Sequence, residues 1–367
     1  MATTYSSIFG ALTLNVQARI NAASKLQKDL FDKAYYPTYL DWDTPSIGLN
    51  FEEIMGKYNI SIAAATVGDG SKEPVLGVNG ASTYANKVFK HAITRPLTIA
   101  EYRKVLAILD SKALTDAQVK QQLVDIMWGT VEDVVNGVKG KIDMIFLGAL
   151  FNEGKFTFDE TTNPEGGVRG LIDYNMPAAN IATADTPWTE ANIATVDPFE
   201  DLSALIAGAE DKVPVAKLLI APSKLNYLLR CPKMRAAVYG TDKAAAPLTL
   251  QILNQFMESN SLPVFEKVTR KVNIKSGNTI NSYSPVNAKN IVAVPAGKIG
   301  TIKNAYADSE LRQENGVTYS LYDRIRVSQW GVGESQGVNG VEYTKAESLS
   351  LPVITEIDGI FTLKTEE

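Results

Sequence analysis

The chain has 367 residues, of which 45% are hydrophobic and 21% are charged, and its formal net charge is -5. This is a globular composition, with enough material for one large domain or two smaller ones. Because no segment is strongly basic, we do not expect a dedicated nucleic-acid-binding surface. The first residues lack the pattern of a secretory signal, and no run approaches the roughly 18 apolar residues of a membrane span. We therefore expect a soluble, cytosolic protein without a membrane partner.

The chain has one cysteine, Cys231, and one histidine, His91. A single cysteine excludes an intrachain disulfide, and a single histidine excludes a multi-histidine metal site. We expect Cys231 to be a small core residue and His91 to lie at the surface or at an interface. The glycine-rich run at 331–337 lacks the dinucleotide-binding spacing and a following helix. No catalytic residue, cofactor or metal site is therefore predicted.

Residues 1–57 are predicted to form an arm. They begin with an amphipathic helical stripe and continue into an aromatic segment that is interrupted by prolines. Tyr36, Tyr39 and Trp42 in this segment are compatible with a carbohydrate platform or with anchors on a neighbouring subunit. We favour the anchors.

Residues 58–98 are predicted to form an extended β-ribbon. Residues 58–67 alternate apolar with small or polar side chains, a glycine-rich tip follows, and residues 83–97 return as a second strand. An isolated two-stranded ribbon is marginally stable in water, so we expect it to pack on another chain. The ribbon is mildly basic through Lys72, Lys87, Lys90 and Arg95. These four residues fit a solvated face or pairing with acidic residues of an adjacent subunit, and both readings stay open.

A long helix is predicted over residues 115–152. Thr115 and Gln118 have the spacing of a capping box, apolar residues then recur every three or four positions, and Gly154 stands where a C-terminal cap belongs. At roughly 1.5 Å per residue the helix would be about 55 Å long, which is longer than an ordinary domain is wide. It therefore has the form of a strut.

Residues 195–310 are predicted to form a compact α/β unit. KVPVAKLLIAP is a continuous apolar strand, typical of a sheet that is covered on both faces, and a helix over residues 222–238 is expected to be interrupted at Pro232. At the end of the chain, ESLSLPVITEIDGIFTLKTEE predicts a β-hairpin that turns at Asp358 and Gly359.

The order of these parts resembles that of a known family. The resemblance is carried by KHAITRPLTIAEYRKVLA, IFLGALFNEGKFTFDE, the series from DPFEDLSALIAGAED to KLLIAPSKLNYLL, and NIVAVPAGKIGTI. The chain resembles the tailed-bacteriophage major capsid proteins of the HK97 fold, and among them the lambda-type major capsid protein E family. The resemblance extends over nearly the whole chain and implies an α+β fold. Its parts would be an N-arm (1–57), an E-loop lying across a neighbouring subunit (58–98), a P-domain (99–194 and 311–367) with the spine helix 115–152, and an α/β A-domain (195–310).

The resemblance also implies the function. The chain would be a non-enzymatic subunit of an icosahedral virion capsid, assembled in the bacterial host cytoplasm as hexamers and pentamers that enclose double-stranded DNA. Its partners would be other copies of itself, a portal, a decoration protein, and the packaged DNA through weak, non-specific contacts. Since only a short arm precedes the ribbon, the resemblance favours a separate scaffolding protein. Covalent crosslinks are not predicted.

Two other functions compete with this one. An encapsulin-like cellular compartment shell would have the same fold, and fold does not determine function. A cytosolic enzyme that uses carboxylates alone is the less favoured reading.

Three glycines interrupt the predicted helix at Gly129, Gly137 and Gly140. Each weakens a helix by roughly 1 kcal/mol relative to alanine. Our hypothesis is that they let the helix bend when the shell expands.

Overall fold

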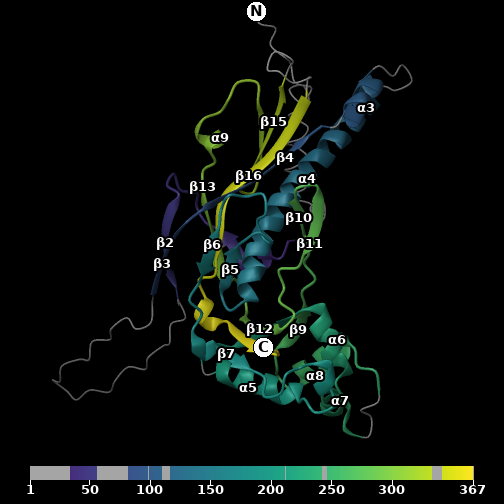
Figure 1. Cartoon of the computed structure of the whole chain (residues 1–367), viewed down its shortest axis with the longest axis vertical. Coiled ribbons are helices and arrows are strands. Elements are labelled where there is room, and N and C mark those ends of the chain that lie inside the picture. The colour runs from purple at the N-terminus through teal and green to yellow at the C-terminus, as the bar shows by residue number, and fades with distance from the viewer. Residues whose placement is uncertain are drawn as a thin grey trace, which may run out of the picture.

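The computed structural model describes residues 34–55, 82–97, 99–109, 116–210, 212–241, 246–332 and 341–366. In this part of the chain, two β-sheets lie toward opposite ends of an elongated subunit, and one long helix runs along it (Figure 1). The predicted N-terminal helical stripe, the first ribbon strand and tip with Lys72, the Thr115 cap and residues 333–337 lie outside the described residues.

The long helix is α4, Asp116–Leu150, and it confirms the predicted strut to within two residues at the C-terminal end. It follows the shorter helix α3, Ile99–Leu109. The turn after α4 is closed by Gly154, which has a φ of +78° and donates its N–H to Ala149 O at 2.9 Å. This is the left-handed cap that glycine favours. Residues 142–150 are buried all round, so the end of the strut is itself a core element.

The first sheet has six strands and packs against α4. Its path is β1 (Leu40–Trp42), β13 (Gly300–Ala305), β16 (Val341–Val353), β15 (Ile325–Val332) and β14 (Thr318–Tyr322), with β4 (Phe89–Pro96) paired to β16. Helix α2 (Tyr36–Tyr39) precedes β1, and helix α9 (Asp308–Leu311) lies between β13 and β14. Because β1 pairs parallel with β13, the start of the described chain is built into this sheet.

The second sheet has five strands, in the order β7 (Ile181–Thr183), β17 (Phe361–Lys364), β12 (Asn290–Pro295), β8 (Val215–Ile220) and β9 (Val264–Lys267). Beside it lie α5 (Pro198–Glu210), α6 (Pro222–Arg230), α7 (Pro232–Tyr239) and α8 (Leu250–Ser259) (Figure 1). The break between α6 and α7 falls at Pro232, as the sequence predicts. Pro222 and Pro232 each open a helix, where the missing N–H removes no intrahelical bond.

The second sheet is covered on both faces, which confirms the expectation from its apolar strand. Leu218 and Ile220 of β8 belong to the core shared with the helices, whereas Leu219 between them belongs to the core around α4. Alternate residues of a strand point to opposite faces. One strand therefore joins the two hydrophobic cores of the subunit.

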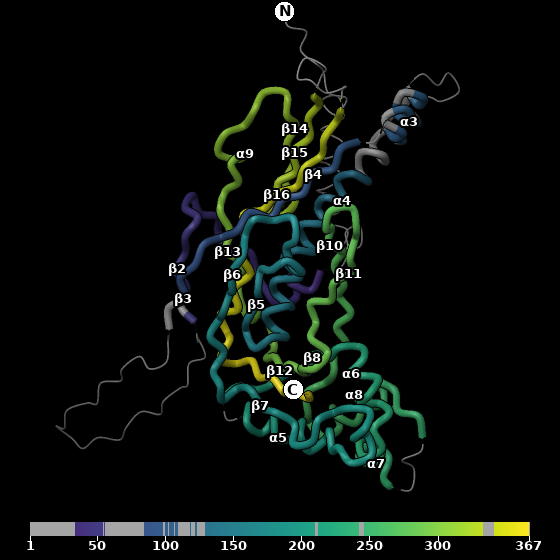
Figure 2. Tube along the Cα trace, in the orientation of Figure 1, coloured from purple at the N-terminus to yellow at the C-terminus, as the bar shows by residue number. Residues whose placement is uncertain are grey.

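In the described part of the chain, three two-stranded sheets accompany the two larger ones. They are β2 (Asn50–Met55) with β3 (Ser82–Lys87), β5 (Lys155–Phe158) with β6 (Gly170–Asp173), and β10 (Val272–Ser276) with β11 (Thr279–Tyr283). The β2–β3 ribbon lies at one side of the subunit, and β10–β11 lies beside α4 (Figure 2). Short 3-10 turns occur at Ala178–Asn180, Glu190–Asn192 and Ile357–Gly359.

The predicted ribbon needs correction in its second strand. Residues 83–97 do not form one strand of a free ribbon, because the chain changes partner at Val88. Before Val88, β3 pairs with β2, which the sequence assigned to the arm; after it, β4 pairs with β16 in the first sheet.

The predicted segment boundaries also need correction, because strands pair across them. β13 lies in the first sheet rather than with residues 195–310, and β7 lies in the second sheet rather than with residues 99–194. The predicted C-terminal hairpin is wrong: the chain does turn at Ile357–Gly359, but β16 and β17 enter different sheets. The Asp-Gly pair predicts where the chain turns, but it does not determine whether the strands on either side pair with each other.

Candidate functional site

The aromatic segment of the arm is part of the subunit's own core. Tyr36 and Tyr39 are 1% and 3% exposed, and the partly buried Trp42 meets Tyr36 edge to face with ring centroids 6.1 Å apart. Tyr39 also packs on Phe146 of α4. The expectation that Tyr36 and Tyr39 anchor the arm on a neighbouring subunit is therefore corrected, because their side chains have no surface to offer.

A buried carboxylate fixes this segment on α4. Asp143 accepts hydrogen bonds from the backbone N–H groups of Tyr35 and Tyr36, at 3.0 and 2.9 Å. The Arg270 guanidinium, from the loop between β9 and β10, lies against the same carboxylate. Burial raises the pKa of Asp143 to about 6, although Arg270 and the two N–H groups oppose the shift. The arm, the strut α4 and the second unit, by which we mean the second sheet with α5 to α8 and its loops, thus meet at one side chain.

The basic residues predicted for the ribbon have partners within the chain. Lys90 pairs with Asp308 and with the buried Glu347, and Arg95 pairs with Glu101 and Asp133. Lys87 is exposed, with its ammonium 5.9 Å from the centre of the Phe89 ring. Lys87 and Lys90 are both exposed, whereas Arg95 is only partly so.

His91 is buried, which corrects its predicted surface position. Its Nε2 lies 3.1 Å from Ser350 O on the neighbouring strand β16. Burial, reinforced by the charge of Lys141, lowers the pKa of His91 to about 4. The ring is therefore neutral at physiological pH.

The three helix glycines have different surroundings. A Cβ at Gly129 would meet nothing within 4 Å, and one at Gly140 would make an ordinary contact with Val272. A Cβ at Gly137 would lie 3.2 Å from Ile93, so this glycine lets β4 approach the helix closely. Sequence reasoning missed Gly148, where a Cβ would lie 2.6 Å from the buried Phe156 ring. Among these positions, Gly129 is the one with no packing role.

Sequence reasoning also missed the exposed apolar residues. Ile47 is 78% exposed beside the base of the β2–β3 ribbon, and Tyr306 is joined to this segment through its N–H, which donates to Ser46 O. Further exposed apolar side chains are those of Leu49, Ile93, Val168, Leu171, Ile280 and Leu311. Periodicity could not separate these from core residues, but they are the residues that a self-associating subunit would cover.

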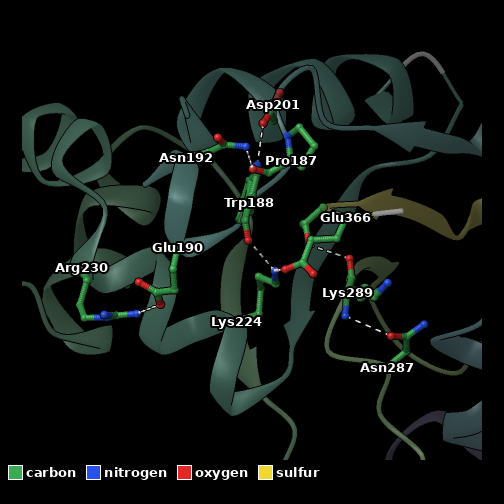
Figure 3. Close-up of polar contacts among 11 residues, drawn as sticks. Pro187, Trp188, Glu190, Asn192, Asp201, Lys224, Arg230, Asn287, Lys289 and Glu366 are labelled. Carbon is green, nitrogen blue, oxygen red and sulfur yellow. Dashed lines mark hydrogen bonds and ion pairs between the residues drawn. The ribbon is translucent and has the colours of Figure 1, made fainter. Parts of the chain in front are cut away.

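The second unit holds a polar cluster at the end of the chain (Figure 3). The buried Lys224 ammonium donates to Trp188 O at 3.1 Å and pairs with Glu366 at 2.5 Å. Trp188 in turn donates its indole N–H to Asp201 at 2.8 Å. These contacts hold the last described residue of the chain in the fold, and none of them has the arrangement of a catalytic site.

The described residues contain no group of three or more histidine, cysteine, aspartate or glutamate side chains placed to hold a metal ion. Within the same residues, no helix is both long and apolar enough to cross a membrane. Cys231 is buried as predicted, and its thiol faces the carbonyl oxygens of Ile193 and Val196.

Comparison with known proteins identifies the family. The family model of phage major capsid protein E matches residues 48–365, whereas no curated protein matches the chain. A solved prophage capsid protein from E. coli CFT073 is 13% identical, with a TM-score of 0.59 over 95% of this chain and 98% of that one. A phage-related protein from Bordetella bronchiseptica RB50 is 10% identical, with a TM-score of 0.53 over 96% and 97%. The chain belongs to the phage major capsid protein E family and is a structural shell subunit with an HK97-like α+β fold.

Proposed function

We propose that copies of this chain assemble as hexamers and pentamers into an icosahedral phage capsid that encloses packaged double-stranded DNA. The observation that carries the proposal is the family match over residues 48–365. The fold supports it, because the subunit combines a strut, a lateral ribbon and exposed apolar side chains such as Ile47. Obligate interfaces of this kind commonly bury more than roughly 2,000 Å².

The two sheets support a domain assignment. The first sheet with α4 would be the P-domain, and the second sheet with α5 to α8 would be the A-domain. β2 and β3 would form the base of the E-loop. In this assignment the exposed Lys87, together with Lys72 and the outer face of Trp42, contacts a neighbouring subunit, whereas Lys90 and Arg95 brace the subunit itself.

The wider set of partners rests on the family. A portal, a separate scaffolding protein and a decoration protein would act with the shell, and the packaged DNA would make weak, non-specific contacts with its inner wall. A net charge of -5 agrees with weak contact, since strong binding needs many lysine and arginine residues facing the phosphates. Assembly would take place in the host cytoplasm, without catalysis by this chain.

The test is to produce the chain with and without its scaffolding protein and to examine the product by electron microscopy and light scattering. We expect closed shells with five-fold and six-fold capsomers. A well-behaved monomer under every assembly condition would contradict the proposal. Shells that copurify with an enzyme cargo and lack portal vertices would instead favour a cellular compartment.

A further inference from the structure

Among the strands that the structure describes, β4 has one edge without a partner strand. β16 pairs with β4 along one side, and β13 and β15 occupy the other side of β16, so β4 ends the sheet. The N–H of Leu97 donates to Glu342 O at 2.7 Å. This bond shows which alternate residues of β4 direct their backbone groups toward β16. In an antiparallel pair every second residue bonds to the partner strand. Ile93 therefore bonds to β16, while Ala92 and Thr94 direct their backbone N–H and C=O groups away from it.

Those outward groups have no partner among the described residues. Ala92 and Thr94 are exposed, and no hydrogen bond in the described part of the chain engages their N–H groups. Pro96, which has no N–H, closes the strand at one end. Between Lys90 and Pro96 the edge is left open, as a template for another strand.

The open edge borders a groove of about 690 Å³. Its walls are β4, the C-terminal half of α4, the loop 162–168 and β10. Apolar side chains line it at Ile93, Val138, Met144, Phe158 and Val168. Among the described lining residues, the charged side chains are Lys90, Lys141 and Lys275 and one carboxylate, that of Glu165.

We propose that this groove receives an extended segment of a second copy of the chain, which adds a strand to the open edge of β4. The edge supplies main-chain hydrogen bonds, and the apolar lining accepts alternate side chains. Lys90 is already paired with Asp308 and Glu347, so the positive charge of the groove rests on Lys141 and Lys275 against Glu165. A second copy complements it, because the chain is acidic overall, with a net charge of -5. From Lys90 to Thr94 the edge spans roughly 13 Å, which matches about five residues of partner strand. The inference rests on the proposed function and names the receiving surface.

Amide hydrogen exchange tests the pairing without any mutation. We compare dissociated subunits with assembled shells of the unmodified chain. The amides of Ala92 and Thr94 should slow on the order of 100-fold on assembly, whereas the Ile93 amide, bonded to β16, should be slow in both states. Equally fast exchange of Ala92 and Thr94 in shells overturns this inference and leaves the proposed function standing. Slowing that needs a different protein also overturns it, and a chain that never assembles overturns both.

A backbone variant provides the second test. Ala92→Pro removes an N–H that faces away from β16, so the internal ladder of the sheet stays complete. We expect folded subunits whose shell yield falls at least 10-fold, and the matched control Ala92→Ser, which keeps the N–H, should assemble like the parent chain. A shell yield of Ala92→Pro equal to that of the control overturns the inference. If Ala92→Pro fails to fold, the exchange experiment on the unmodified chain decides.

Discussion

Asp143 and Arg270 form a buried ion pair, with Arg270 Nε 2.8 Å from Asp143 Oδ2. The pair connects residue 143 of the strut to a loop of the second unit, and the same carboxylate holds the start of α2. The position of the arm therefore depends on one charged side chain in the core.

Asp143→Ala should strongly destabilise the subunit. The change leaves the Arg270 guanidinium buried without its charge partner and removes the acceptor for two backbone N–H groups, a loss of about 3–5 kcal/mol in the free energy of unfolding. Urea denaturation of the purified chain measures it. Asp133→Ala is the matched control on the same helix, because the Asp133 pair with Arg95 is exposed; it should cost less than about 1 kcal/mol. Equal losses for the two variants would contradict the role of Asp143.

The same carboxyl predicts a pH dependence. Burial raises the pKa of Asp143 from 3.8 to about 6, so the folded state binds this proton more tightly than the unfolded state. The stabilising contribution is complete below pH 3.8 and is lost as the pH rises through 6. It amounts to about 3 kcal/mol, at about 1.4 kcal/mol per pH unit.

Asp143→Asn lacks this titration, and it is compared with the parent chain by denaturation at several pH values. The free energy of unfolding of the parent chain, minus that of Asp143→Asn, should fall as the pH rises from 4 to 7. A constant difference would show that the carboxyl titrates normally.

Two glycines of α4 should respond in opposite directions to alanine. Gly148→Ala places a Cβ against the buried Phe156 ring and should cost about 1–3 kcal/mol through overpacking. Gly129→Ala meets nothing within 4 Å and should stabilise the helix by up to about 1 kcal/mol. Thermal unfolding of the two variants measures both effects.

Gly129→Ala is also the cleanest test of the bending hypothesis, since alanine at Gly137 would disturb Ile93 as well. If the helix must bend, shells of Gly129→Ala should form but expand more slowly, as followed by small-angle scattering. Expansion at the parent rate would remove Gly129 from the hypothesis.

Tyr36 offers a test of where the arm belongs. Its hydroxyl is buried and finds no hydrogen-bond partner among the described residues, so Tyr36→Phe should leave stability unchanged or raise it by about 1 kcal/mol. Tyr36→Ala should cost about 3–5 kcal/mol by opening a cavity. Both changes should appear in the unfolding of the dissociated subunit. A Tyr36→Ala subunit that is normally stable but fails to assemble would show that Tyr36 acts at a subunit interface.

The end of the chain should stabilise the second unit. Glu366→Ala leaves the buried Lys224 ammonium with Trp188 O as its remaining acceptor, so unfolding should become easier by about 1–3 kcal/mol. The loss is smaller than for a fully buried pair because Glu366 is 29% exposed. Lys224→Met combined with Glu366→Ala should recover most of it. If the double variant is as unstable as Glu366→Ala, the effect comes from backbone packing near Thr365.

Much of the element pattern was predictable from the sequence. The strut, the Pro232 break and the doubly covered strand β8 follow from periodicity, proline chemistry and apolar runs, which are local properties. The family could be recognised from the order of these parts. The candidate surface was less accessible, because an exposed Ile47 and a buried Ile145 carry the same side chain.

Only the tertiary structure decided the partners. The split of residues 83–97 at Val88, the parallel pairing of β1 with β13 across some 260 residues, and the entry of β17 into the second sheet all join distant segments. Periodicity records that a face is to be buried but not which segment buries it. The sequence alone determined a strut-bearing capsid subunit, and the fold decided that Tyr36 faces its own core while β4 keeps an open edge.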